Sequence, residues 1–276
     1  MAPRPDRTDR SGRPPVGPSD LHARGPEHRT WTASLTAMEQ PDDTNAAIWK
    51  NDEIIRSRQE RAGEREQKNA AQWRRLAELL PFGVDDAFTF ADLGAGTGVA
   101  AREILVRYPR STAILTDFSA PMIAAGTAEL AAFDGRFRYV EFDMSSSTWP
   151  TAIPATLDAV VTSMCIHHMP DDRKQGLFSE IYDRLAPGAW YFNYDAIGSN
   201  DPVVEAQWQH MHDQDDPASA VQRLHRTPVE QDRHANHVRY LIPLADQLEF
   251  LRSAGFTGID VYWKNLDDVI YGGRRP

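Results

Sequence analysis

Three alternating glycines form the stretch of this sequence that is best suited to hold a ligand. They lie two, four and six positions after Asp92 (Gly94, Gly96 and Gly98). Glycine adopts positive φ angles and lets a ligand approach the backbone without a Cβ in the way. A helix that begins near Thr97 would direct its unpaired N–H groups at the same ligand. After the first strand of an α/β sheet, such a turn predicts an adenosine-containing cofactor.

Acidic residues also end the second and third predicted strands. Asp117 follows the segment 111–116, and Asp143 follows the segment 137–142. A carboxylate at the end of the second strand can accept both hydroxyl groups of a ribose. Single acids at strand ends often only cap helices. Three of them in register with a glycine turn favour a nucleoside site at one edge of the sheet.

Two adjacent histidines follow the fourth predicted strand, and an acid ends the fifth. His167 and His168 lie in the link 163–170, and Asp195 ends the segment 189–195. Histidine titrates near neutral pH, which suits proton transfer. His168, His167 and Asp195 are therefore candidate bases. The alternative is that the histidines are hydrogen-bonded residues of a pocket wall.

The segments that must position these residues alternate between strand and helix. Predicted strands cover 88–93, 111–116, 137–142, 157–164 and 189–195, and predicted helices cover 99–108, 121–133 and 171–185. A helix over 243–254 and an antiparallel pair, 256–263 with 267–271, close the chain. Short links between alternating elements predict an α/β fold with a doubly wound, mostly parallel sheet of seven strands.

Composition limits the partners and the location. The chain has 276 residues and a net charge of −10, which opposes broad binding to nucleic acid. No apolar run approaches the roughly 18 residues of a membrane helix, and the N-terminus lacks the apolar core of a secretory signal. We therefore expect a cytoplasmic protein without nucleic-acid or membrane partners. Its one cysteine, Cys165, is expected to be a buried small side chain rather than a nucleophile.

The later histidines do not follow a zinc motif. His210 and His212 diverge on a helix because residues i and i+2 do not share a face. These two histidines together with the three that follow them in the insertion show no recognised zinc-ligand spacing, so the sequence predicts no metal site. Those three are His225, His234 and His237.

The motifs together resemble those of the class I S-adenosylmethionine-dependent methyltransferases. The glycine turn reads Asp-x-Gly-x-Gly-x-Gly, the link after the fourth strand resembles the family's Leu-His-His segment, and Leu185–Ala189 resembles its Leu-x-Pro-Gly-Gly turn with Ala189 in the last position. The likeness spans about residues 85–275. It implies a Rossmann-like methyltransferase fold and S-adenosylmethionine as cofactor, with S-adenosylhomocysteine as product.

The resemblance also implies which residues contact the cofactor. The turn and the strand ends would hold the methionine and ribose parts, an acid with its neighbour would meet the adenine amino group, and two apolar side chains would flank the ring. The implied set is Asp92, Gly94, Ala95, Gly96, Thr97, Gly98, Asp117, Phe118, Met122, Asp143, Met144, Ser163 and Met164.

Transfer of a methyl group to the carbon or oxygen of a small-molecule acceptor, typical of secondary metabolism, is the function we expect. The likeness to such enzymes favours carbon methylation of a prenyl or indole-terpenoid compound. The Asn/Asp-Pro-Pro-Tyr motif of amino methyltransferases is missing. Alternatives are a tRNA-modifying methyltransferase, a non-catalytic cofactor-binding protein and a nicotinamide-dependent reductase, although Val99 replaces the third glycine of the dinucleotide motif.

Three regions flank or interrupt the predicted methyltransferase domain, which covers residues 85–276. Residues 1–40 are rich in proline and mixed charges, which predicts a disordered tail. Residues 41–84 predict a helical cap of two helices joined near Gly63, through which the protein could form a homo-oligomer. Residues 198–242 are a polar insertion that we expect to cover the acceptor site as a lid; its apolar residues could equally form a core of their own.

Overall fold

The computed structural model describes residues 62–276 and most of their side chains. Its strands are β1 (Thr89–Leu93), β2 (Thr112–Asp117), β3 (Phe137–Glu141), β4 (Leu157–Ser163), β5 (Leu185–Ala196), β6 (Thr257–Asn265) and β7 (Asp268–Arg274). Its α-helices are α3 (Ala62–Leu79), α4 (Val99–Arg107), α5 (Ala120–Glu129), α6 (Asp171–Arg184), α7 (Pro202–Asp215), α8 (Pro217–Leu224), α9 (Pro228–Arg239) and α10 (Leu244–Ala254). Two short 3-10 helices are η1 (Ala131–Phe133) and η2 (Ile166–His168).

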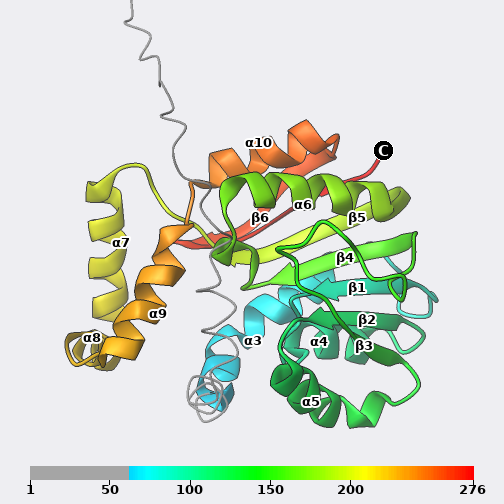
Figure 1. Cartoon of the computed structure of the whole chain (residues 1–276), viewed down its shortest axis with the longest axis horizontal. Coiled ribbons are helices and arrows are strands. Elements are labelled where there is room, and N and C mark those ends of the chain that lie inside the picture. The colour runs from blue at the N-terminus through cyan, green and yellow to red at the C-terminus, as the bar shows by residue number, and fades with distance from the viewer. Residues whose placement is uncertain (1–61) are drawn as a thin grey trace, which may run out of the picture. The chain divides into compact units, whose positions relative to one another are not determined.

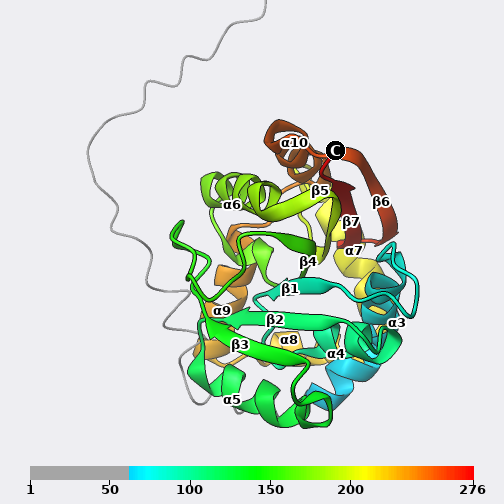
Figure 2. The ribbon, with the colours of Figure 1, turned by 90° about the vertical axis from the view of Figure 1, so that its right-hand side faces the viewer.

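All seven strands belong to one sheet in the order β3-β2-β1-β4-β5-β7-β6 (Figure 2). The first five pair in parallel, and β7 runs antiparallel to both β5 and β6. The predicted α/β fold with a mostly parallel sheet of seven strands is confirmed. Parallel neighbours place the carboxyl ends of β1, β2 and β4 at one edge, where Asp92 lies opposite Leu115 and Val161.

Helices cover both faces of the sheet, as the doubly wound prediction requires (Figure 1). One apolar core includes Leu177 of α6 and Leu251 of α10, and the other includes Leu76 of α3 and Ile104 of α4. Because both faces are covered, the central strands are apolar almost throughout rather than alternating. No helix within residues 62–276 combines the length and apolar character needed to cross a membrane.

Two predicted boundaries are wrong by four residues, and the last strand ends at Arg274 rather than at residue 271. The helix predicted over 121–133 ends at Glu129, because Leu130 turns into the core and the chain continues as η1. The fifth strand starts at Leu185, where it pairs with Leu157, before the register shifts to the pair Ala159–Trp190. The predicted Leu-x-Pro-Gly turn is therefore an irregularity inside β5, and Gly188 has a φ of 85° there.

The described part of the N-terminal cap lies against the carboxyl ends of the central strands. The indole N–H of Trp73 in α3 donates to Ser163 Oγ at 2.7 Å, and the Tyr194 hydroxyl donates to Asn69 Oδ1 at 3.3 Å. Gly63 lies in the first turn of α3. The predicted tail and the first predicted helix lie outside the described residues.

The insertion consists of three helices, α7, α8 and α9, gathered beside the carboxyl ends of the parallel strands (Figure 1). Each begins with a polar cap followed by proline, a pattern that starts helices efficiently. No residue of α7 or α8 is buried, so these two helices do not enclose a core of their own. Buried Lys174 of α6 donates to Asp171 and to the Tyr240 carbonyl, which fastens the end of α9 to α6.

Candidate functional site

The glycine turn has the backbone geometry that only glycine adopts readily. The φ angles are 67° at Gly94, 56° at Gly96 and 77° at Gly98, which caps α4. A Cβ added at Gly94 would lie 2.8 Å from Met144 Cε and 2.9 Å from Cys165 Cβ. The turn is therefore a tight backbone surface, with the Met144 side chain and the link after β4 packed beside it.

Asp117 fixes the shape of this turn. Its carboxylate accepts the N–H groups of Gly96 and Ser119, both at 2.9 Å. The hydroxyl of Tyr139 in β3 donates to the Gly96 carbonyl at 3.0 Å. Carboxylate oxygens have further lone pairs, so Asp117 can bind the turn and a ligand hydroxyl together.

Asp92 lies beneath the turn rather than on its surface. One carboxylate oxygen accepts the Ala101 N–H at 3.1 Å, and the other, Oδ1, is buried without a hydrogen-bond partner. Burial raises the pKa of Asp92 to about 7, and the charge of Asp117 adds to the rise. Asp92 thus anchors the start of α4 at a cost in stability when it is charged.

We expect Asp92→Asn to raise the free energy of unfolding by roughly 3 kcal/mol more at pH 8 than at pH 5. In the wild type the folded pKa lies above the unfolded value. Protonation therefore favours the fold at low pH, and that contribution is lost as pH rises towards 7. Asparagine has no charge to bury, so the stability of the variant should not decrease as the pH rises in this range. Urea unfolding of both proteins at the two pH values measures the difference in free energy of unfolding. An equal difference at pH 5 and pH 8 would contradict the raised pKa of Asp92.

The predicted adenine-side residues occupy different positions around the turn. The Met122 side chain from α5 reaches the turn, with Cε 3.2 Å from the place of a Cβ on Gly96. Phe118 is half-buried at the end of β2. Asp143 is exposed two residues after β3, and its carboxylate accepts the Ser145 N–H at 2.9 Å.

The link after β4 adjoins the glycine turn from the other side. Ser163 is held by Trp73, and Met164 has a positive φ of 53° while its N–H donates to the Tyr194 carbonyl at 2.7 Å. The Cys165 thiol donates to the Leu93 carbonyl at 3.3 Å. Burial and nearby carboxylates raise the pKa of Cys165, which keeps it protonated and unsuited to be a nucleophile.

His167 and Asp195 form a buried pair next to this link. The His167 backbone N–H donates to Asp195 Oδ2 at 3.0 Å, and its ring Nδ1 is hydrogen-bonded to Asp195 Oδ1. Burial raises the pKa of Asp195 to about 6, although Asn193 and other hydrogen bonds oppose the rise. A carboxylate at Nδ1 favours the tautomer that carries its proton there, which leaves the Nε2 lone pair for another partner.

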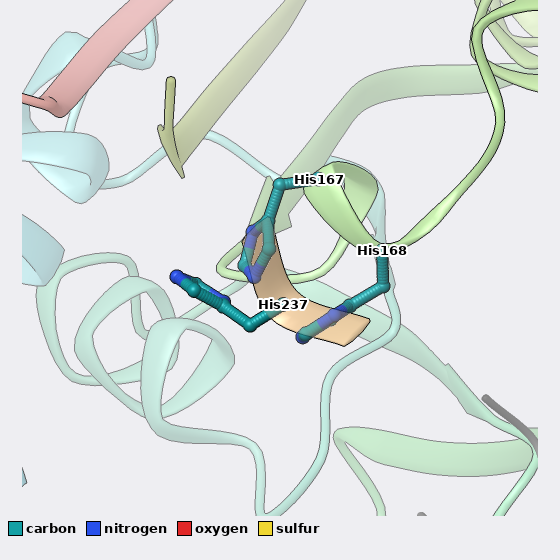
Figure 3. Close-up of side chains that lie close together, drawn as sticks. All are labelled: His167, His168 and His237. Carbon is teal, nitrogen blue, oxygen red and sulfur yellow. The ribbon is translucent and has the colours of Figure 1, made fainter. Parts of the chain in front are cut away.

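A third histidine comes from the insertion. His237 of α9 has its ring centroid 4.7 Å from that of His167 and 5.6 Å from that of His168, while the first two centroids are 4.0 Å apart. The three side chains gather in one place (Figure 3). Burial lowers the pKa of His237 to about 3, with His167 and His234 contributing, so its ring is neutral at pH 7.

Sequence reasoning missed several residues that the fold brings to this edge. Trp73 and Asn69 arrive from α3, Tyr139 from β3 and His237 from α9. Local spacing relates His237 only to the other histidines of the insertion. Its partners precede it by about 70 residues, a separation that no local spacing rule detects.

Comparisons with known proteins agree with this fold. Residues 90–188 match the model of a family described as "Methyltransferase domain". No curated protein matches the sequence. Among solved structures, the chain is similar to an O-methyltransferase family protein from Burkholderia thailandensis, with 18% identity, a TM-score of 0.60, and coverage of 84% of this chain and 62% of that one.

Two further structures give similar values. The pyocyanin biosynthetic protein PhzM has 15% identity and a TM-score of 0.57, with 84% of this chain and 61% of that chain covered. PigF with SAH has 14% identity and a TM-score of 0.57, with coverage of 83% and 61%. At these identities the likeness shows the fold. The chain matches about three fifths of the length of each of these proteins.

Proposed function

We propose that this protein transfers a methyl group from S-adenosylmethionine to the oxygen or carbon of a small molecule, typical of secondary metabolism. The match of residues 90–188 to the methyltransferase domain model supports the proposal. One observation carries the proposal. His167, which is hydrogen-bonded to Asp195, lies two residues after Cys165, and Cys165 contacts both Leu93 and the position of Gly94. A group able to move a proton thus adjoins the cofactor turn.

The residues of the turn fit the cofactor. A cradle with positive φ at its glycines, N–H groups at the start of α4 and a carboxylate at the end of β2 suits an adenosine with a methionine tail. S-adenosylmethionine supplies a methyl group on a positively charged sulfur. The residues proposed to hold it are Gly94, Ala95, Gly96, Thr97, Gly98, Asp117, Phe118, Met122, Asp143, Met144, Ser163 and Met164, and Asp92 would support the turn from beneath.

The proposed catalytic residues are His168, His167 and Asp195. Asp195 holds the His167 ring through Nδ1 and supports positive charge on it. The opposite ring nitrogen, Nε2, then faces away from the carboxylate and can take a proton from an acceptor hydroxyl. His168 is adjacent to this ring and would orient the acceptor. The α3 and α9 helices beside the link would exclude water from the reaction.

This arrangement favours an acceptor that loses a proton, such as a phenol or an enol, over the prenyl or indole-terpenoid carbon favoured by the sequence. Methylation of a prenyl carbon forms a carbocation, which aromatic faces stabilise. Two of the insertion's aromatic rings already have cations on their faces. Lys264 lies 4.7 Å from the centroid of Trp208, and Arg239 lies 5.0 Å from that of Tyr240.

The test is methyl transfer from isotope-labelled S-adenosylmethionine to matched acceptors, detected by mass spectrometry. A panel of phenols and enols should include members that gain the label, whereas their methyl ethers should not. Calorimetry with S-adenosylhomocysteine is measured in parallel on the same protein. Binding of the cofactor product without transfer to any panel member would argue for a non-catalytic protein. Transfer to the methyl ethers alone would contradict the need for a proton acceptor.

A further inference from the structure

The histidine cluster formed by His167, His168 and His237 has features that proton transfer does not require. One nitrogen from each ring can be chosen so that no two of the three atoms are more than 4.8 Å apart. His167 and His168 are fixed by η2 at the end of β4, and His237 arrives from α9, which packs against η2 (Figure 3). Proton transfer needs one such ring, so the convergence of three calls for a different explanation.

The chemistry of the cluster suits a metal ion better than three separate proton carriers. Imidazole rings this close to one another would repel if all three were protonated. Neutral imidazole is the form that binds metal. The carboxylate of Asp195 on His167 Nδ1 adds the outer contact that orients metal-binding histidines and raises their basicity.

We propose that His167, His168 and His237 form a binding site for one divalent transition-metal ion of the zinc class. In a tetrahedral site with three histidines, neighbouring nitrogens are roughly 3.3 Å apart. Closing from at most 4.8 Å to this separation needs only small rotations of the three side chains. Three protein ligands leave a fourth position open, which is the arrangement of catalytic rather than structural zinc sites.

The metal would connect the insertion to the sheet. Two ligands lie on the link after β4 and the third lies on α9, about 70 residues later, so the metal site is complete only when α9 packs against η2. The spacing of the histidines within the insertion predicts no metal site, because two of the three ligands lie outside the insertion. The ligand set spans two elements, which is common for catalytic sites and invisible to a short motif.

The ion's role rests on the proposed function. A Lewis acid at the open position would lower the pKa of an acceptor hydroxyl, so that the oxygen becomes nucleophilic near neutral pH. With the ion bound, the His167 ring is a metal ligand rather than a base, so the hydroxyl proton would leave to solvent or to a buffer base, and the ion would replace the proton transfer proposed for His167 in the metal-free protein. The Asp195–His167 pair keeps its orienting role in either case.

Cobalt binding tests the site independently of activity. Co²⁺ replaces Zn²⁺ in such sites and absorbs visible light when its coordination is tetrahedral, so the untagged full-length protein is titrated with Co²⁺ after removal of metals with a chelator. We expect one equivalent to give visible absorption bands that one equivalent of Zn²⁺ abolishes. His237→Ala should weaken Co²⁺ binding by at least about 100-fold, because loss of even an outer contact typically costs 10- to 100-fold.

His225→Ala is the matched control, since it removes an exposed histidine from the same insertion and should leave the bands unchanged. Calorimetry with S-adenosylhomocysteine checks that each variant is folded, and His168→Gln replaces His237→Ala if the latter fails that check. Absence of the bands in the wild type, or their persistence in the folded ligand variant, would overturn the metal site. Either outcome with intact binding of S-adenosylhomocysteine leaves the proposed methyltransferase function standing.

Discussion

Gly96→Val is expected to lower the affinity for S-adenosylmethionine by at least about 100-fold while the protein still folds. The backbone of Gly96 has a φ of 56°, a conformation that costs an L-residue roughly 1–2 kcal/mol. A Cβ there meets only the flexible tip of Met122, at 3.2 Å, so the unliganded fold can adjust. The added side chain instead occupies the surface that the adenosine must approach.

Gly135→Val is the control that separates the effect of backbone strain from blockage of the cofactor-binding surface. Gly135 has a φ of 78°, so valine meets the same backbone cost, but no atom lies within 4 Å of its added Cβ. Calorimetry with S-adenosylmethionine and thermal unfolding are measured on both variants. Both should lose comparable stability, and only Gly96→Val should lose cofactor affinity. Equal affinities in the two variants would show that the cofactor does not lie on this turn.

The sequence predicted the turn well because its information is local. Glycines that need positive φ, acids at strand ends and prolines at helix starts each act over a few residues. Asp117 and Gly96 meet across only 21 positions, within one strand–helix–strand unit. The alternation of strands and helices then fixes which strand ends share an edge.

The remainder of the site depends on contacts that no local pattern encodes. Trp73 meets Ser163 across 90 positions, and His237 reaches His167 from a helix in the polar insertion. No residue of α7 or α8 is buried, so hydrophobic periodicity does not show where these two helices lie on the domain. Their contacts with the rest of the domain join residues far apart in the sequence, such as Trp208, which packs against the core, and His212 Nε2 with Asp267 Oδ1 at 2.5 Å.

Asp195→Asn is expected to reduce kcat for methyl transfer by roughly 10²- to 10⁴-fold, the range of a proton-transfer contribution. The asparagine oxygen should remain on the His167 backbone N–H, which needs an acceptor. The side-chain amide would then donate to His167 Nδ1. This hydrogen bond forces the ring proton to Nε2, so the nitrogen that faces the acceptor can neither take a proton nor bind a metal.

Asp267→Asn is the control, because it makes the same change in the His212–Asp267 pair of the insertion, a half-buried pair with no proposed part in the reaction. It should keep kcat within a few-fold of the wild type. Affinity for S-adenosylhomocysteine should be unchanged in both variants, since neither carboxylate lies on the glycine turn. A change in the tautomer of His167 cannot weaken cofactor binding at the glycine turn. If Asp195→Asn instead lost cofactor affinity and kept kcat, Asp195 would be a structural support of the cofactor-binding site.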